Sequence, residues 1–488
     1  MKILLTMLVS ALFLNGSGVQ KNAGMDGVVA GDGINTAFIS FKKDTSHQEQ
    51  LDAIASFGDA IEAVHYYENI PGLTLVTLSQ NSLDNVLSTS RLIGNNSAVS
   101  FFEMDKRFTA VHSEVIPNDA GFSLCWGHRN TGTSGGLVNF DMNTTNAWST
   151  TQGSEAVKIL VLETGIQQDH PDINQLPGRD FTTGAVNGVS GGGPSNSCDN
   201  HGTSVAGCIT GAINNSIGTV GVAPKCKVIS AKVGVSITPC NGSWQGQISW
   251  TVNAINWAIG NGVRVTNNSN DYGTVSAAMS NAYGAAKAAG VVNFASSGNS
   301  GNTTIGFPAS AAGVNAVGAS SRNGQKASFS SYGVKLAFTA PGQSVYTTDR
   351  TGVDGYGSGD YVTIDGTSFS SPYAAGVAAL VISANPSLTA VEVESIMQST
   401  CKDMGTAGFD TLTGWGALDA DGAVREGVRR ACPADFDGDG SVSGNDLGIL
   451  LSSWGVSDLD ITGDGVVDGG DMGTLSCLHG GLVLEGDE

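Results

Sequence analysis

Apolar residues near the beginning of the chain follow a mixed pattern of short strands and helices. Alternating apolar runs, typical of half-buried strands, are separated by stretches with helical spacing. The strand-like runs are residues 36–41, 73–78 and 99–102, and the helical stretches lie around residues 48–57 and 82–89. Residues 33–108 are therefore expected to form a small α+β unit.

The middle of the chain, residues 155–424, has a different pattern, in which apolar β runs are followed by alanine-rich helical stretches. The β runs are residues 157–162, 227–233, 263–267, 291–295 and 316–319. Continuous apolar runs are typical of strands that are covered on both faces. This part predicts an α/β fold, in which a mostly parallel sheet is flanked by helices.

The first residues indicate export. Met1-Lys2 is a short basic start, and the apolar run 3–14 that follows ends in Asn15-Gly16-Ser17-Gly18. This is the outline of a secretory signal peptide, so we expect a secreted protein. No later run reaches 18 apolar residues, so no membrane span is expected.

Charge and cysteine content narrow the range of partners. The chain has 23 Lys and Arg against 44 Asp and Glu, a formal net charge of -21, which argues against nucleic acid or an anionic membrane as partner and favours calcium as counter-ion. Its 8 cysteines show no Cys-x-x-Cys spacing, so in an exported chain we expect disulfides rather than thiolate metal sites. The pairing stays open.

Two short strings carry the catalytic signal. Residues 201–207 read HGTSVAG, and residues 366–372 read GTSFSSP before an alanine-rich helical stretch at 372–383. We interpret Ser368 as a nucleophile at the start of that helix and His201 as the base that takes its proton. The alternative for each string alone is an N-capping serine and a surface histidine, and their joint occurrence favours catalysis.

Further motifs surround these two strings, namely ILVLETG at residues 159–165, His-Pro-Asp at 170–172 and SGNSG at 297–301. With them, residues 126–423 resemble the subtilisin-like serine peptidases. The resemblance implies that Glu163 orients His201 and that the Asn299 amide completes the oxyanion hole. It also implies that Ser269 and Gly298 bind an extended peptide substrate. Gly306, at the pocket floor, leaves room for a large apolar or aromatic side chain.

Two departures from the family pattern support an alternative function. Glu163 stands where the family has aspartate, one methylene shorter. Asn270-Asp271-Tyr272 replaces the usual Leu-Gly-Gly and makes the groove wall more polar and acidic. A misplaced catalytic acid would leave an impaired pseudopeptidase, or a binding protein built on the same scaffold.

Two further segments resemble known parts of this family. Residues 213–219, followed by 221–224, are similar to its calcium loop. The implied calcium ligands are the Asp172 carboxylate, the Asn215 side-chain oxygen and the carbonyls of Ile213, Ile217 and Thr219. The α+β unit looks like the inhibitor-type propeptide of a zymogen, with cleavage expected between Asp105 and Cys125.

The acidic C-terminal tail contains a repeat that begins at Ala434 and again 25 residues later at Leu459. Both copies have the EF-hand spacing of oxygen ligands, with a glycine at the sixth loop position. The expected calcium ligands are Asp435, Asp437, Asp439, Asp446, Asp460, Thr462, Asp464 and Asp471. The duplication resembles a dockerin module, which implies a cohesin-like or cell-surface scaffold as partner. We expect Cys432 and Cys477, which flank the module, to form a disulfide across its ends.

The expected organisation is therefore a signal peptide at 1–18, an inhibitor-like propeptide at 19–120, a peptidase domain at 121–430 and the dockerin-like calcium module at 431–488. A third interpretation makes attachment through the tail the main function, with the peptidase as its passenger.

Overall fold

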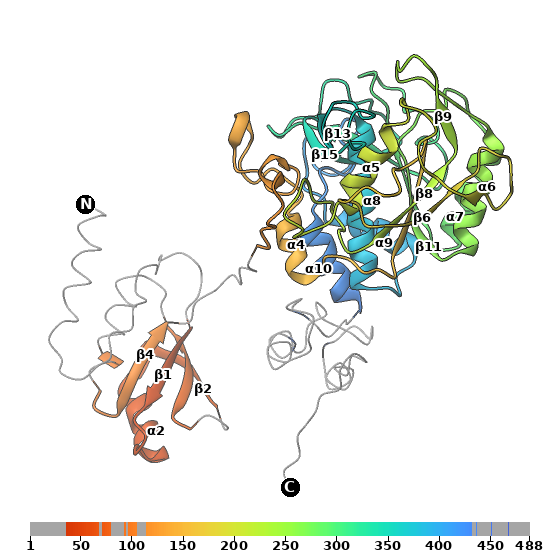
Figure 1. Cartoon of the computed structure of the whole chain (residues 1–488). Helices are drawn as coiled ribbons and strands as arrows, with labels where there is room; N and C mark the ends of the chain where they lie inside the picture. The colour runs from red at the N-terminus through yellow and green to blue at the C-terminus, as the bar shows by residue number, and fades with distance from the viewer. Residues whose placement is uncertain are drawn as a thin grey trace, which may run out of the picture. The chain divides into compact units, whose positions relative to one another are not determined.

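The computed structural model describes residues 36–67, 71–79, 92–93, 96–104 and 114–431, together with positions 436, 450 and 467. The chain divides into two compact units, Met1–Val111 and His112–Glu488 (Figure 1). The expected signal peptide, the helix around residues 82–89 and all eight ligands of the C-terminal repeats lie outside the described residues. So do Cys432 and Cys477.

The described residues of the first unit include an antiparallel sheet with strand order β2-β3-β1-β4 and the helix α2. Its elements are β1 (Thr36–Phe41), α2 (His47–Ser56), β2 (Ile61–Tyr66), β3 (Leu73–Leu78) and β4 (Val99–Met104). Every second residue of β1 and β3 is buried, as the alternating sequence predicts. Ser46 and Glu49 form a capping box that starts α2. The α+β prediction is confirmed here, although β2 was not foreseen.

The second unit is built on an eight-stranded sheet with order β14-β13-β12-β11-β5-β8-β6-β7. Its strands are β5 (Lys158–Glu163), β6 (Gln175–Asp180), β7 (Val189–Ser190), β8 (Lys227–Lys232), β11 (Val263–Asn268), β12 (Val292–Ser296), β13 (Asn315–Ser320) and β14 (Leu336–Pro341). All neighbouring strands are parallel except β6 and β7, which are antiparallel. The five predicted β runs all form strands, and the mostly parallel sheet is confirmed.

Helices and two hairpins complete this unit. The helices are α4 (Thr144–Thr150), α5 (His201–Thr210), α6 (Ile248–Gly260), α7 (Ala277–Ala288), α8 (Thr367–Ala384), α9 (Ala390–Ser399) and α10 (Ala420–Ala431). The hairpins are β9 (Gly234–Ser236) with β10 (Trp244–Gly246), and β15 (Val345–Thr348) with β16 (Tyr361–Ile364). Within the described residues, no helix has both the length and the apolar character needed to cross a membrane.

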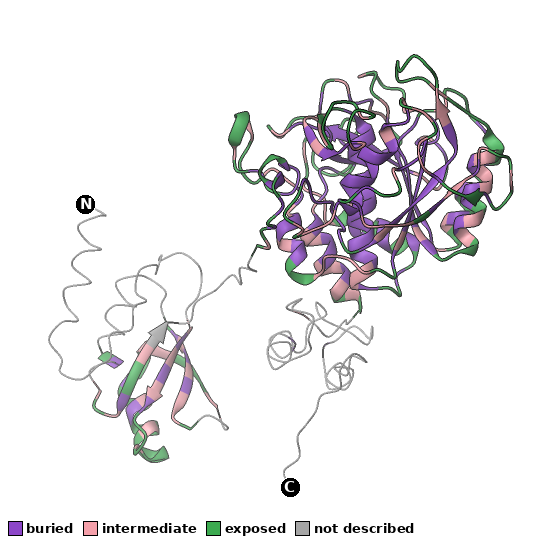
Figure 2. Cartoon of the chain, in the orientation of Figure 1, coloured by how far each residue is buried: buried purple, intermediate pink, exposed green. Residues whose placement is uncertain are grey.

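Strand β5 shows why the sheet is covered on both faces. Ile159 and Val161 belong to one apolar cluster with α5 and α8, whereas Leu160 and Leu162 belong to another with α6 and α7. Successive side chains of a strand point to opposite faces, so a strand between two helical layers must be apolar throughout. The central strands of the sheet and α8 are accordingly the most continuously buried parts of the unit (Figure 2).

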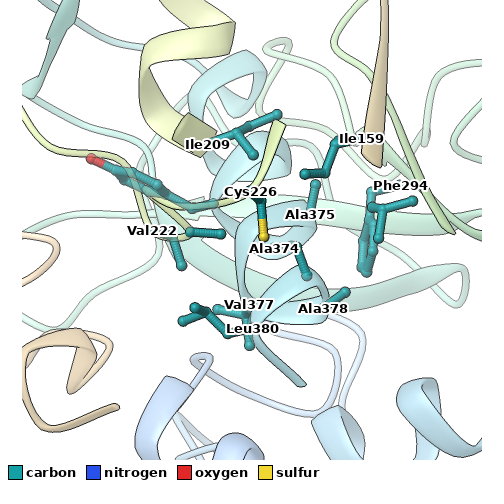
Figure 3. Packing of buried hydrophobic residues seen from close by; sticks show 14 of the residues in the cluster. Ile159, Ile209, Val222, Cys226, Phe294, Ala374, Ala375, Val377, Ala378 and Leu380 are labelled. Atoms are coloured by element: carbon teal, nitrogen blue, oxygen red, sulfur yellow. The ribbon is translucent and has the colours of Figure 1, made fainter. Parts of the chain in front are cut away.

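Helix α8 runs through the centre of the unit, and every residue from Thr367 to Ile382 is buried. Ala374, Ala375 and Ala378 lie against residues of α5, β5 and β12 (Figure 3). The sequence pattern predicted a helix from residue 372, and this start is wrong. Helix α8 begins with Thr367 and continues through Pro372, which removes only the backbone donor to the Ser368 carbonyl.

Four of the six cysteines that the structure describes are unpaired. Cys198 and Cys240 form a disulfide, which agrees with the expectation for one pair. Cys125, Cys208, Cys226 and Cys401 are free thiols. The first three are buried in the apolar interior, where cysteine packs as a small hydrophobic residue, so for these four the expectation of disulfides is wrong.

Candidate active site

The candidate catalytic residues come from segments far apart in sequence that meet at one edge of the sheet. Glu163 is the last residue of β5, and Ser269 directly follows β11. His201 is the first residue of α5, and Ser368 is the second residue of α8. The carboxyl ends of parallel strands and the amino ends of the following helices lie at the same edge, where α/β proteins place their ligands.

Glu163 and His201 form a close pair. Glu163 Oε1 lies 2.9 Å from His201 Nδ1, and the Glu163 side chain is fully buried while that of His201 is 24% exposed. Two donors complete the environment of the carboxylate, because Thr164 N–H donates to Oε2 at 3.2 Å and Asn270 Nδ2 donates to Oε1 at 2.9 Å. The longer acid therefore reaches the imidazole.

The charge of Glu163 determines the basicity of His201. Burial alone lowers the pKa of the imidazole, but the negative charge of Glu163 and its hydrogen bond together outweigh burial and raise that pKa above its ordinary value. His201 is thus a stronger base than a free histidine, and its other ring nitrogen is left to exchange a proton with a substrate or nucleophile.

Ser368 is held against Ser269. Ser368 Oγ donates to the Ser269 carbonyl at 3.1 Å, and Ser269 Oγ donates to the Ser368 carbonyl at 2.7 Å. That carbonyl is free to accept because its usual helical donor, four residues on, is Pro372, which has no N–H. Ser269 thus lies beside the proposed nucleophile, as expected of a substrate-binding residue.

The imidazole lies next to the amino end of α8. The rings of His201 and Phe369 have centroids 5.7 Å apart, which places His201 beside the residue that follows Ser368. Among the hydrogen bonds of the described residues, none joins His201 to Ser368. Catalytic hydrogen bonds are often long without substrate and tighten when it binds, so this geometry agrees with a base within reach of the serine.

Asn299 is oriented for anion binding. Its Oδ1 accepts from the backbone N–H and from Oγ1 of Thr367, both at 2.9 Å, so its NH₂ group is directed away from that contact. Gly298 N–H donates to Thr367 Oγ1 at 3.2 Å and fixes the same loop. The Ser368 N–H, at the second position of α8, has no intrahelical acceptor. Two donors therefore lie beside the Ser368 hydroxyl.

Two other aspartates near the motifs are engaged elsewhere. Asp199 is buried, lies 3.6 Å from the buried Lys232 ammonium and accepts the Ser195 and Ser236 N–H groups at 2.7 Å each. Asp169 Oδ1 accepts from Gln167 Nε2 at 3.0 Å. Neither contacts His201 in the structure, whereas Glu163 does.

Comparison with known proteins shows to which family the chain belongs. The model of the subtilase family matches residues 154–416, more than half of the chain. The chain belongs to the subtilase family. An alkaline protease from Alkalihalobacillus alcalophilus is 33% identical over 365 residues, which cover 75% of this chain and 82% of the relative.

Other matches agree with this family. Subtilisin BL from Lederbergia lenta is 38% identical over 269 residues, which cover 55% of this chain and 91% of the relative. A solved protease structure from Pseudoalteromonas arctica superposes with a TM-score of 0.55 and 30% identity, covering 64% of this chain and 99% of that chain. The protein is therefore a serine endopeptidase of the subtilase family with the α/β fold of that family.

A second polar site surrounds Asp172. Its Oδ1 accepts from Asn215 Nδ2 at 2.6 Å, and its Oδ2 accepts from Thr219 N–H at 2.9 Å. Burial raises the pKa of the Asp172 carboxyl to about 6. Asn215 thus presents its NH₂ to Asp172, while its Oδ1 accepts from Ile217 N–H at 3.0 Å, so the side-chain oxygen expected as a ligand is turned away.

Asp119 is a member of this second site that the sequence did not reveal. Its Oδ2 accepts from Asn214 N–H at 2.8 Å, but its buried Oδ1 has no hydrogen-bond partner. Burial raises the pKa of Asp119, and the negative charge of Asp119 in turn raises the pKa of Asp172. Asp119 lies far from the loop 213–219 in sequence. The only feature that could have indicated it is that it is an acidic residue shortly before Trp126.

The donor set of this loop fits calcium. Subtilases commonly bind calcium. Two buried carboxylates and a turn whose carbonyls come from Ile213, Ile217 and Thr219 provide the hard oxygen ligands that calcium prefers. The unpartnered Oδ1 of Asp119 is the observation that favours a cation, because a buried oxygen without a donor is costly.

Proposed function

We propose that this subtilase is a secreted, calcium-stabilised endopeptidase made as a zymogen, which cleaves peptide bonds by a Ser368–His201–Glu163 triad. The observation that carries the proposal is the Glu163–His201 contact of 2.9 Å beside the amino end of α8. It supplies the oriented, basic imidazole that a serine nucleophile requires.

The chemistry follows from the positions of the side chains. Ser368 Oγ attacks the scissile carbonyl carbon while His201 takes its proton, and Glu163 stabilises the resulting imidazolium. The tetrahedral oxyanion accepts from the Asn299 NH₂ and the Ser368 N–H, at the positive end of α8. His201 then protonates the leaving amine, which leaves an acyl-enzyme. Water activated by the same imidazole hydrolyses the ester and restores Ser368.

The alternative is a catalytically impaired pseudopeptidase or binding protein. The contact between Ser368 Oγ and the Ser269 carbonyl favours it, because this contact engages the nucleophile away from His201. Glu163 itself does not favour it, since its additional methylene still allows the 2.9 Å contact and Asn270 donates to the same oxygen. Asn270 and Glu163 are both departures from the family pattern, and the hydrogen bond from Asn270 helps to hold Glu163 in place.

The first unit supports synthesis as a zymogen. It is an independent α+β unit, and the similarity to the alkaline protease spans 365 residues, which is longer than the family match. Residues 114–120 belong to the larger unit, where Val115 N–H donates to Thr145 O and Asn118 N–H donates to Asn214 Oδ1. We therefore propose that cleavage occurs before residue 114, within the expected range of 105–125.

The proposals that the protein is secreted and that its tail is a dockerin-like module are supported by the sequence alone. The signal peptide outline at residues 1–18 supports export. The duplicated calcium spacing at 431–488 supports a dockerin-like module that binds calcium and attaches the enzyme to a cohesin-like or cell-surface scaffold.

The test is hydrolysis of casein in millimolar calcium by the processed wild-type chain beside a Ser368→Ala variant. Activity is expected in the wild type alone, because the variant lacks the nucleophile while its fold is retained. Circular dichroism of both proteins controls for folding. Equal activity in the variant would refute the assignment of Ser368. Absence of activity in correctly folded, processed wild type would favour the pseudopeptidase.

A further inference from the structure

A carboxylate lies against a glycine on the wall of the proposed substrate site. A methyl group built on Gly306 would lie 2.6 Å from Asp271 Oδ2 and 2.9 Å from its Cγ. Gly306 has no positive φ, so its backbone does not require glycine. The absence of a side chain there instead leaves the space that the Asp271 carboxylate reaches.

The backbone of Asp271 lies near the segment that contacts the proposed nucleophile. Asp271 is two residues beyond Ser269, whose carbonyl contacts Ser368 Oγ, and two residues span at most about 7 Å. Gly306 N–H donates to Ser297 O at 3.1 Å, so Gly306 adjoins the loop that carries Asn299. A scissile carbonyl held between the Ser368 hydroxyl and the Asn299 amide thus has residues 269–271 on one side and 297–306 on the other.

The position of Asp271 is fixed by its neighbours. Its Oδ1 accepts from Gly273 N–H at 2.8 Å, which leaves Oδ2 directed at Gly306. Tyr272 N–H donates to Phe307 O at 2.8 Å, and the Tyr272 ring packs edge-on against Trp244 at a centroid distance of 5.0 Å. The two loops are therefore joined directly beside the carboxylate, so the negative charge is preorganised.

Among the described residues, no cation of the protein neutralises this charge. None of their ion pairs includes Asp271, and its side chain is exposed. An exposed carboxylate without a cationic partner attracts a ligand cation and disfavours a purely apolar group that would strip its water. This differs from the large apolar side chain that Gly298 and Gly306 suggested from sequence.

We propose that Asp271 is a specificity-determining residue, and that the enzyme prefers peptides with lysine or arginine directly before the scissile bond. The long stem of either side chain would pass Gly298 and bring its cationic end to Asp271 Oδ2, which lies against Gly306. The inference rests on the proposed endopeptidase function, because it concerns the substrate of the same site.

The experiment compares peptide p-nitroanilides that differ only in the residue before the scissile bond, with Arg, Lys, Phe or Leu at that position. We expect the processed wild-type enzyme to show higher kcat/KM for Arg and Lys than for Phe and Leu. In Asp271→Asn, which retains the acceptor for Gly273 N–H, kcat/KM for Arg should fall about 10- to 100-fold and that for Phe should rise. Asp271→Glu should keep the preference for Arg.

A charge-matched control separates a local effect from a change in net charge. Glu155→Gln removes the same charge from a side chain that is 78% exposed and precedes the amino end of β5, opposite the edge that holds the active site. Its Arg-to-Phe ratio should equal that of the wild type. The preference for Arg should also weaken in 1 M salt, where the Debye length is about 3 Å.

The outcomes separate the two proposals. A wild type that cleaves Phe and Leu substrates best, with a ratio unchanged in Asp271→Asn, would overturn the specificity inference and leave the peptidase function standing. An equal shift in Glu155→Gln would also overturn it, since the effect would be one of net charge. A folded, processed wild type that cleaves none of the four substrates or casein would overturn the proposed function, and with it this inference.

Discussion

Two buried acidic sites in the same unit differ in how fully their carboxylates are partnered. Glu163 has an imidazole and two hydrogen-bond donors, with both oxygens engaged. The second site places Asp172 and Asp119 close enough for their charges to interact, and Asp119 Oδ1 has no donor. The first site is complete in the protein alone, whereas the second has a surplus of negative charge that a cation would balance.

The comparison of the two sites indicates that one fold can use buried carboxylates for two purposes. A carboxylate surrounded by donors is fixed in position and charge, and can therefore tune the pKa of a neighbouring base. Two buried carboxylates that share too few donors repel one another, and a bound divalent ion would relieve that repulsion. Under the proposed function, catalysis uses the first arrangement and calcium binding uses the second.

The largest effect is expected from Glu163→Gln, which keeps the shape of the catalytic acid and removes its charge. The amide cannot stabilise the imidazolium or hold the correct tautomer, so kcat should fall about 10⁴-fold. The measurement is steady-state hydrolysis of a peptide p-nitroanilide, with Ser368→Ala as background. A loss below tenfold would show that the charge of Glu163 is not used.

The matched control for that variant is Glu163→Asp, which keeps the charge and shortens the stem. Because the structure places glutamate at 2.9 Å from His201, shortening should open the contact and lower kcat about 100-fold. Increased activity in Glu163→Asp would instead indicate that glutamate impairs this triad, as the pseudopeptidase alternative requires.

An intermediate effect is expected from calcium removal. Calcium at 100 times its Kd stabilises the folded state by about 2.7 kcal/mol, so for a unit of about 320 residues EGTA should lower the Tm by about 4 °C, measured by calorimetry on Ser368→Ala to avoid autolysis. Asp119→Asn distinguishes this loop from the C-terminal repeats. It should lower the Tm in calcium and raise the Tm in EGTA, because it removes a ligand in one case and a repelling charge in the other. A Tm change of the same sign in both conditions would contradict calcium binding by Asp119.

The smallest expected effect is the dependence of kcat/KM and of folding stability on pH. Catalysis needs neutral His201, and the pKa of this imidazole is raised above its ordinary 6.5, so kcat/KM should rise with pH through a midpoint above 6.5. The Glu163 pair stabilises the folded protein when the imidazole is protonated, and this stabilisation is lost as pH rises through the same midpoint. In Glu163→Gln only burial acts, which lowers the pKa, so the His201 midpoint should move below 6.5 in ¹H–¹⁵N spectra of the imidazole. An unchanged midpoint would contradict this pairing.

Sequence predicted the parts of the site that occur in contiguous strings. His201 and Ser368 each lie in a glycine-containing string at a helix start, where residue type and position alone indicate the chemistry. The strands were predicted because strands buried on both faces are apolar throughout. The role of Glu163 was implied only by the resemblance to the subtilisin-like peptidases, and the structure adds that Glu163 reaches His201.

The remaining parts depend on contacts between distant segments. Asn270 was interpreted as groove wall, yet it donates to Glu163, 107 positions earlier in the chain. Asp119 reaches the loop at Asn214 across 95 positions. The approach of Asp271 to Gly306 requires two loops to be joined through Tyr272 and Phe307. No local periodicity or spacing encodes such pairs, so they emerge only when the sheet is assembled.

Because α8 is buried, the loss of enzyme activity is expected to follow the unfolding of the core. Every residue from Thr367 to Ile382 is buried, so the serine stands on a helix whose amides beyond the first turn exchange with solvent only when the core opens. Partial opening at the surface leaves the nucleophile in place. Heat should therefore inactivate the enzyme in a single event, and the rate at which activity decays is the rate at which the core itself unfolds.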